Sequence, residues 1–377
     1  MRKSVHIIPF FLLMIIFNHC RRGLKQTFFH PDSPQTVNWG VDESRTGFSN
    51  STISPPLKLV WKHRPSGGLG RAIGAVDSLI YFGTRDGHVA FLHYRTGKKI
   101  KTFNIQKKSS VTCAILGSLL VVALQRDKPS LRVLDLQTQK TIWEYHVGDI
   151  EGEPLVHQNT IYIGNTRGHI YALQIESGQV LWENELHIPL YSSLVINHGR
   201  LIATADDGRL FCLSLKKGEL LWQRKLPGPI HATPVMGEHA VWIGTTQARF
   251  FSISTLDGSI QWQFKSEGAV FEKASFVDGS LYFGTTQGFI YCLNAINGEV
   301  IWHTQLEGAV GTSPFIGNHH LVLGTLNKQI VILNRHRGEE IWRFSLEHRI
   351  RTTPLIWNSV LVVASEDRRV YGFSMLE

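Results

Sequence analysis

Short apolar runs separated by glycine and polar residues recur along this chain with a period of about 40 residues. In one clear copy the apolar runs cover residues 281–283, 290–293 and 300–302, and Gly288 and Gly298 mark the turns between them. Apolar runs interrupted by glycine and polar residues at such short spacing predict antiparallel strands. Beyond the first 20 residues no stretch shows the 3.6-residue periodicity of an amphipathic helix. We therefore expect an all-β structure.

Each repeat has room for four strands, which is the content of one propeller blade. Inner three-strand units begin near residues 71, 111, 151, 191, 231, 271, 311 and 351. The first outer strand, residues 57–63, precedes every inner unit, and the last inner unit, residues 353–373, has no outer strand after it. Pairing these two segments would close the ring and hide both sheet edges. We predict a single eight-bladed β-propeller over residues 38–377, with four antiparallel strands per blade.

A tryptophan ends almost every repeat, and Lys101 takes the one remaining position. The series consists of Trp61, Trp143, Trp182, Trp222, Trp262, Trp302 and Trp342. Equivalent repeat positions lie at equivalent places around a ring, so we expect structural blade docking by each indole rather than a sugar-binding ladder. Cys212 and Cys292 take a small buried position of the repeat, and the chain has no CxxC pair that would suggest a zinc site.

The repeat also carries a recognisable docking motif, Ala-x-Asp-x-x-Thr-Gly-x-x-x-Trp. Ala172, Ser177, Gly178 and Trp182 match it, and Asn294, Gly298 and Trp302 match it again three repeats later. From about residue 39 to its C-terminus the chain therefore resembles the PQQ-like (quinoprotein-type) β-propeller repeat family. The motif's aspartate is mostly replaced, with Asp135 the exception, so we expect blade-to-blade capping to differ in detail.

The N-terminus has the features of an export signal. A basic start, Met1-Arg2-Lys3, precedes 13 mostly apolar residues, 5–17, which are too few for an ordinary membrane span. Cys20 follows at the place of a lipid-modified cysteine, although residues 17–19 depart from the usual small-residue box. We interpret residues 1–20 as a signal peptide of the lipoprotein type, with plain secretion or an uncleaved anchor as alternatives. Residues 21–37, basic and proline-containing, then form a tether.

Charge adds little. Removal of residues 1–20 would lower the formal net charge from +9 to +7, and the basic residues are scattered, which disfavours nucleic-acid binding. In register, the inner strands bring six chemically active residues toward the central channel: Glu151, Glu153, Tyr191, His231, Lys273 and Arg351. Such a set could serve acid–base chemistry, but a solvated, charge-balanced channel mouth is the simpler interpretation. We assign no catalytic, cofactor-binding or metal-binding residue.

The resemblance implies two contrasting functions. Quinoprotein dehydrogenases bind PQQ and calcium beside a vicinal cysteine pair, and this chain has no adjacent cysteines. In layout the chain is more similar to the BamB-type lipoproteins, which implies a non-enzymatic, lipid-anchored scaffold supporting outer-membrane protein assembly from the periplasmic side. Its partners would be envelope proteins, such as a β-barrel assembly protein, and the membrane; a soluble periplasmic form is the alternative location. The alternative function is binding of a small ligand or cell-wall glycan in the channel.

Overall fold

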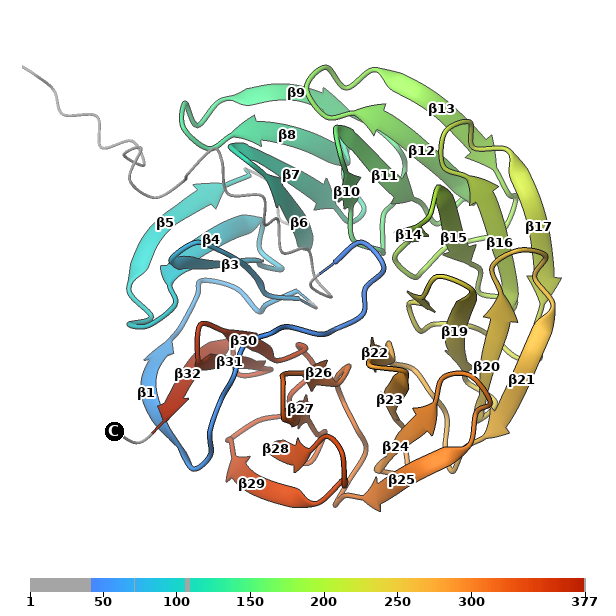
Figure 1. The fold of residues 1–377 in the computed structure, drawn as a ribbon. Helices are drawn as coiled ribbons and strands as arrows, with labels where there is room; N and C mark the ends of the chain where they lie inside the picture. Colours follow the sequence, from blue (N-terminus) through green and yellow to red (C-terminus); the bar gives the residue numbers. More distant parts are fainter. Residues whose placement is uncertain (1–41, 71, 106–108, 376–377) are drawn as a thin grey trace, which may run out of the picture.

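A computed structural model describes residues 42–70, 72–105 and 109–375. In these residues it contains strands and no helix, and the strands form eight four-stranded antiparallel sheets around a ring (Figure 1). The predicted eight-bladed propeller is thereby confirmed. No helix within the described ranges has the length and hydropathy needed to span a bilayer. The predicted signal peptide, Cys20 and the tether lie outside the described residues.

Each blade has one strand in each of four concentric layers. The innermost strands are β2 (Gly74–Val76), β6 (Val111–Leu116), β10 (Leu155–His157), β14 (Val195–Asn197), β18 (Val235–Met236), β22 (Ser275–Val277), β26 (Phe315–Ile316) and β30 (Leu355–Trp357). The second strands are β3 (Leu79–Gly83), β7 (Leu119–Leu124), β11 (Thr160–Gly164), β15 (Arg200–Thr204), β19 (Ala240–Thr245), β23 (Ser280–Gly284), β27 (His320–Gly324) and β31 (Val360–Ser365).

The outer half of each blade repeats the same scheme. The third strands are β4 (His88–His93), β8 (Leu131–Asp135), β12 (His169–Gln174), β16 (Arg209–Ser214), β20 (Arg249–Ser254), β24 (Phe289–Asn294), β28 (Gln329–Asn334) and β32 (Arg369–Met375). The outermost strands are β5 (Lys99–Asn104), β9 (Thr141–Tyr145), β13 (Val180–Glu185), β17 (Leu220–Lys225), β21 (Ile260–Lys265), β25 (Val300–Gln305), β29 (Glu340–Ser345) and β1 (Leu57–His63). We number the blades 1 to 8 from the one that begins with β2.

The ring closes as the repeat count predicts. Strand β1 pairs antiparallel with β32, with Leu57 opposite Met375 and His63 opposite Val370. Blade 8 therefore has the order β1-β32-β31-β30 and joins the two ends of the chain. Because of this pairing, neither the first nor the last repeat is left as an incomplete blade with an exposed sheet edge.

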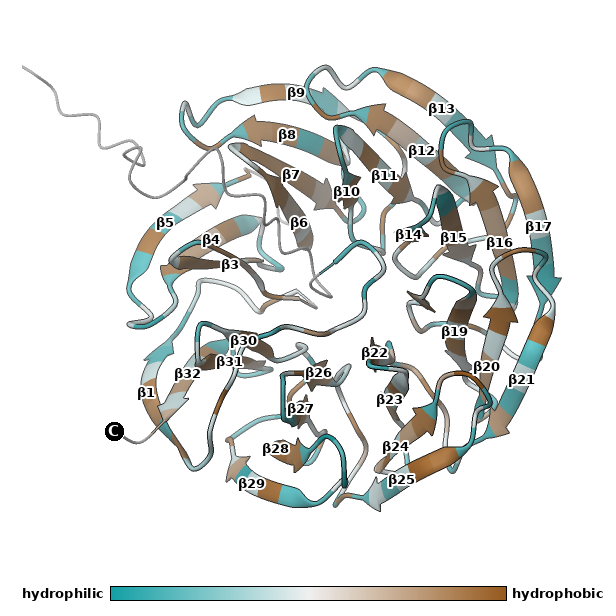
Figure 2. Cartoon of the chain, in the orientation of Figure 1, coloured by the Kyte–Doolittle hydropathy of each residue, from teal (hydrophilic) through white to brown (hydrophobic). Residues whose placement is uncertain are grey.

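The hydrophobic core lies between the faces of neighbouring blades. The second strands are almost wholly buried, as in β19, while the outer strands alternate between exposed and half-buried positions, as in β13. Figure 2 shows the same contrast, with hydrophobic residues along the inner strands and alternating bands along the outer ones. One buried cluster joins Val195 and Ile202 of blade 4 to Ala232 and Ile253 of blade 5.

Six of the seven repeat tryptophans contact the next blade in the same way. The Trp222 indole N–H donates to the Thr255 carbonyl at 3.0 Å, and the same bond joins Trp61 to Tyr94, Trp143 to Ile175, Trp182 to Leu215, Trp262 to Ala295 and Trp302 to Arg335. A glycine in the following turn makes room for the ring. At Gly218, with φ +70°, a Cβ would lie 2.4 Å from the Trp182 ring.

The exceptional repeat shows why that glycine is needed. Lys101 replaces the indole, and its Nζ donates to the Gln139 side chain at 2.7 Å. Gln139 takes the turn position that glycine has in other blades and keeps its positive φ of 61°. Because no indole lies over this turn, a side chain fits there, and the lysine and glutamine replace the tryptophan and glycine as a pair.

An N-terminal segment, residues 42–54, crosses one end of the central channel; we call it the strap (Figure 1). Backbone amides of four innermost strands donate to its carbonyls: Ile196 to Glu43, Met236 to Ser44, Phe276 to Thr46 and Ile316 to Gly47. The strap thus links blades 4 to 7 in turn before it reaches β1. The repeat pattern gives no hint of this segment, because it has no periodicity of its own.

Candidate functional site

The end of the channel opposite the strap holds a cavity of about 710 Å³, which we call the mouth cavity. Its charged and aromatic lining consists of Arg85, His231, Phe271, Glu272, Lys273, Arg351 and Glu366. Hydroxyl groups of Thr233, Thr353 and Ser365 complete the polar wall. A second cavity of about 280 Å³ shares His231 with the first and is also lined by Glu151, Tyr191 and Asp206. The two cavities therefore adjoin at His231.

Two segments of each blade, both at the same end of the channel, position these side chains. The first is the segment just before the innermost strand, which carries Tyr191, His231, Phe271 and Arg351 at the same repeat position in blades 4, 5, 6 and 8. The second is the turn between the second and third strands, which carries Arg85, Asp206 and Glu366, 15 residues after the first position of the same blade. Backbone hydrogen bonds tie the two segments together, as from the Asp206 amide to Pro189 and from the Glu366 amide to Arg349.

The six channel residues of the sequence analysis fall into three groups. Glu151, Tyr191 and His231 line the smaller cavity, and His231, Lys273 and Arg351 line the larger one. Glu153 lies deeper, 7% exposed, where it accepts a hydrogen bond from Arg45 of the strap. Glu151 accepts a hydrogen bond from the Gln125 amide. Sequence reasoning missed Arg85, Asp206 and Glu366, although their constant 15-residue offset from the inner-strand starts would have found them.

Arg45 fastens the strap to the ring. It is fully buried at a positive φ of 55°, in a turn that the Asp42 carboxylate holds by accepting from the Thr46 amide. Its guanidinium donates to Glu153 Oε2 at 3.1 Å and to the Leu194 carbonyl at 2.9 Å. Lys273 Nζ in turn donates to the Arg45 carbonyl at 2.9 Å. These three charged residues hold blades 3 and 6 to the strap, and Lys273 also lines the mouth cavity.

Lys273 should give the protein a measurable pH dependence. Burial lowers the pKa of Lys273 from 10.5 to about 7, against the attraction of Asp42. Between these pH values the unfolded chain binds more protons than the folded one, so stability rises with pH across this window. We expect the Lys273→Met variant to lack this rise, which amounts to at most about 1.4 kcal/mol per pH unit. Urea unfolding of both proteins at pH 7, 8 and 9 measures it; parallel pH profiles would contradict the assignment.

The cysteines of the described residues do not suggest nucleophilic chemistry. Cys113, Cys212 and Cys292 are unpaired thiols. Burial raises the pKa of Cys212 to about 12 and the pKa of Cys292 to about 11. Both therefore stay protonated at neutral pH and pack as small apolar side chains.

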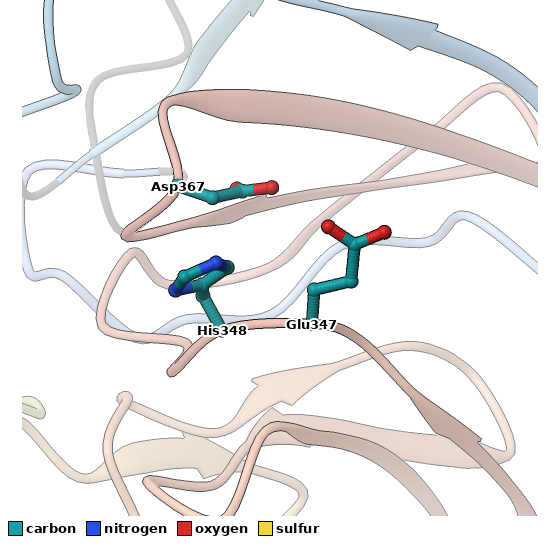
Figure 3. Close-up of side chains that lie close together, drawn as sticks. All are labelled: Glu347, His348 and Asp367. Carbon is teal, nitrogen blue, oxygen red and sulfur yellow. The ribbon is translucent and has the colours of Figure 1, made fainter.

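One surface group has the composition of a metal site. Glu347, His348 and Asp367 place one possible ligand atom each within 4.8 Å of one another (Figure 3). Arg369 already bridges the two carboxylates, with Nη1 2.6 Å from Glu347 and 3.0 Å from Asp367. Burial alone would raise the pKa of Asp367, but hydrogen bonds from Ser365 and Tyr371 hold this pKa below its ordinary value. The arrangement is accounted for as a salt-bridge network.

The repeats, the closed ring and the eight blades agree with one protein family. A family model described as outer membrane protein assembly factor BamB matches residues 55–197, 166–315, 265–335 and 286–377. The chain belongs to the BamB family. This confirms the resemblance that the docking motif and the blade count indicated.

Relatives of this BamB-family protein are distant. The curated BamB proteins of Legionella pneumophila and Pseudomonas aeruginosa are each 28% identical to it, over 109 and 87 residues. These matches cover 26% and 21% of this chain, and they span 27% and 23% of the two relatives, about a quarter of their length. The crystal structure of BamB from Moraxella catarrhalis is 20% identical, with a TM-score of 0.71, over 85% of this chain and 100% of that one.

The fold is shared with enzymes as well. A quinohaemoprotein alcohol dehydrogenase from Comamonas testosteroni has a TM-score of 0.75 at 12% identity, over 91% of this BamB-family chain and 81% of the enzyme. At such identity the likeness shows the fold alone. The described residues that line the mouth cavity include no tryptophan on which a quinone could stack, and of its two carboxylates Glu366 is paired with Arg351 at 2.9 Å. This lining fits a stacked quinone with a calcium ion beside it poorly.

Proposed function

We propose that this protein is a non-enzymatic scaffold of the cell envelope that supports the assembly of outer-membrane proteins. The observation that carries the proposal is the BamB family match, which runs through the blades from residue 55 to residue 377. The ring itself suits such a role. Its outermost strands present edges and hairpins around the circumference, to which a partner domain or an extended segment can add.

Two exposed apolar turn residues mark the place where we propose that the partner docks. Leu256 of blade 5 and Ile296 of blade 6 are 73% and 85% exposed. They occupy the turn between the third and outermost strands, where the other blades that have this turn carry polar residues: Arg95, Gln137, Glu176, Lys216 and His336. This turn adjoins the hairpin between the first two strands, as the Thr255 amide bonds to His239. The apolar pair therefore lies on the face that the strap crosses.

Anchoring follows from the same proposal. Residues 1–20 serve as a lipoprotein-type signal, Cys20 carries the lipid, and residues 21–37 tether the ring to the membrane. The chain enters the ring at the strap, on the face that also carries Leu256 and Ile296. A partner at the membrane surface would then meet this face. The proposed location of the protein is the periplasmic side of the outer membrane.

The test is capture of the tagged, full-length protein from envelopes in mild detergent, with mass spectrometry of the proteins that copurify. We expect a barrel-assembly protein in near-equal amount. Leu256→Asp/Ile296→Asp should lower its recovery at least about tenfold, since charges replace an apolar contact at an interface centre. Cys20→Ser should move the protein from the membrane to the soluble fraction.

The control uses the same turn position in other blades. Gln137→Asp/Glu176→Asp changes two equally placed turn residues of blades 2 and 3 and should leave the recovery unchanged. A clean preparation without a stoichiometric partner would contradict the scaffold function. Equal loss in both double variants would contradict the docking site alone.

A further inference from the structure

The mouth cavity and its smaller neighbour carry opposite charges in different sectors of the ring. Arg85 of blade 1, Arg351 of blade 8 and Lys273 of blade 6 lie in the wall of the larger cavity. Glu151 of blade 3 and Asp206 of blade 4 lie in the wall of the smaller one. Arg85 and Glu151 lie two blade positions apart around the ring, and Arg351 and Asp206 lie four apart. The larger cavity also contains Glu272 and Glu366, so its lining has three basic and two acidic side chains besides His231, whereas the smaller cavity has two carboxylates and His231. A ligand that spans both cavities can thus meet an arginine in the larger one and a carboxylate in the smaller one.

Some of these charged side chains already have an oppositely charged neighbour, and others, which we call open, have none among the described residues. Arg351 pairs with Glu366 at 2.9 Å, and His231 lies 3.6 Å from Asp206. Within the described part of the chain the exposed Arg85 guanidinium has no carboxylate or other acceptor. Among the described residues, Glu151 accepts from the neutral Gln125 side-chain amide, and no lysine or arginine lines its cavity. Within the described residues, one arginine without an acidic partner, Arg85, therefore lines the larger cavity, and one carboxylate without a basic partner, Glu151, lines the smaller one.

An apolar wall lies between the two ends. Phe271 is 45% exposed although it faces a polar cavity, and its ring stacks on His231 with centroids 5.8 Å apart. Tyr191 continues this wall and is 36% exposed. An exposed phenyl face in a concave site is stabilised when a ligand covers it with apolar surface.

We propose that the joined cavities bind a short peptide with free termini, with its carboxylate at Arg85, its ammonium group at Glu151 and an apolar side chain on Phe271. An extended peptide of two to four residues spans roughly 7–14 Å, which sets the length of the peptides to test. The hydroxyl groups of Thr233 and Thr353 face the peptide backbone. A neutral glycan would use neither open charge, so the charge pattern favours the peptide.

The test is calorimetric titration of the full chain, purified in mild detergent, with Ala-Phe-Ala at pH 6.5. The same titration uses the N-acetylated and the C-amidated forms of this peptide. Each modification removes one terminal charge and should weaken binding by about tenfold, as loss of a charged hydrogen bond does. Acetylation should have no effect on binding to Glu151→Gln, and amidation should have none on binding to Arg85→Gln.

Matched controls keep the proposal separate from folding and from the scaffold function. Arg167→Gln, in the equivalent turn of blade 3, and Glu267→Gln, before blade 6, change exposed residues that do not line either cavity; both should bind all three peptides like the unmodified protein. Unfolding midpoints confirm that the variants are folded. Equal affinity for the three peptides, or binding of chitotriose without binding of peptide, would overturn the proposal. Neither result affects the partner-capture experiment, which does not depend on these residues.

Discussion

Replacing Arg45 with alanine is expected to lower the free energy of unfolding by about 3–5 kcal/mol, the range for breaking one partner of a buried ion pair. Arg45 is fully buried and Glu153 is 7% exposed, so the variant leaves a buried carboxylate without its guanidinium. It also removes the hydrogen bond from Arg45 to the Leu194 carbonyl, which joins the strap to blade 4. Urea unfolding followed by tryptophan fluorescence measures the change.

A second variant separates the ion pair from mere loss of side-chain volume. In Arg45→Met/Glu153→Gln neither residue is charged, so the cost of a buried carboxylate that has lost its guanidinium disappears and much of the loss should be recovered. Arg95→Ala, which removes an exposed arginine of blade 1, should change the unfolding midpoint little. An Arg45→Ala variant as stable as Arg95→Ala would show that the strap is not fastened by this pair.

The repeat predicted the ring well because each blade depends on residues close in sequence. An outer strand, its tryptophan and the glycine turn that receives it all fall within one 40-residue period, as with Trp182 and Gly218. Closure followed from counting, since Leu57–His63 and the last three strands were the only unpaired parts. Period and patterning therefore contained most of the information that the fold requires.

The site depends on contacts that no period encodes. Arg45 and Glu153 are 108 residues apart, and Lys273 is 228 residues from Arg45. In the sequence Arg45 is one of four arginines before the first strand, and only the folded strap reveals it as buried. The open charges at Arg85 and Glu151 likewise depend on which neighbours reach them across blades. Sequence reasoning could place side chains around the channel but could not decide which of them already had partners.

The seven tryptophans are equivalent in the sequence but not in the structure, and this leads to the second large effect. Trp222 is 9% exposed, donates to Thr255 and lies over Gly258, whose Cβ would be 2.6 Å from the indole ring. Trp222→Ala would empty a large buried aromatic site between blades 4 and 5. We expect it to lower the free energy of unfolding by about 3–5 kcal/mol, measured from urea midpoints and thermal unfolding.

Trp342 provides the internal comparison. It faces blade 8, where the third and outermost strands come from opposite ends of the chain, so no turn receives its indole. Its ring instead stacks on Phe344, 5.8 Å away, and meets Phe373 edge-on at 5.9 Å. Because these aromatic neighbours remain after substitution and the site is partly exposed, Trp342→Ala should cost clearly less than Trp222→Ala. Equal losses would mean that the glycine-lined turn contributes nothing beyond aromatic burial, and an unchanged midpoint for Trp222→Ala would rule out its role in holding the two blades together.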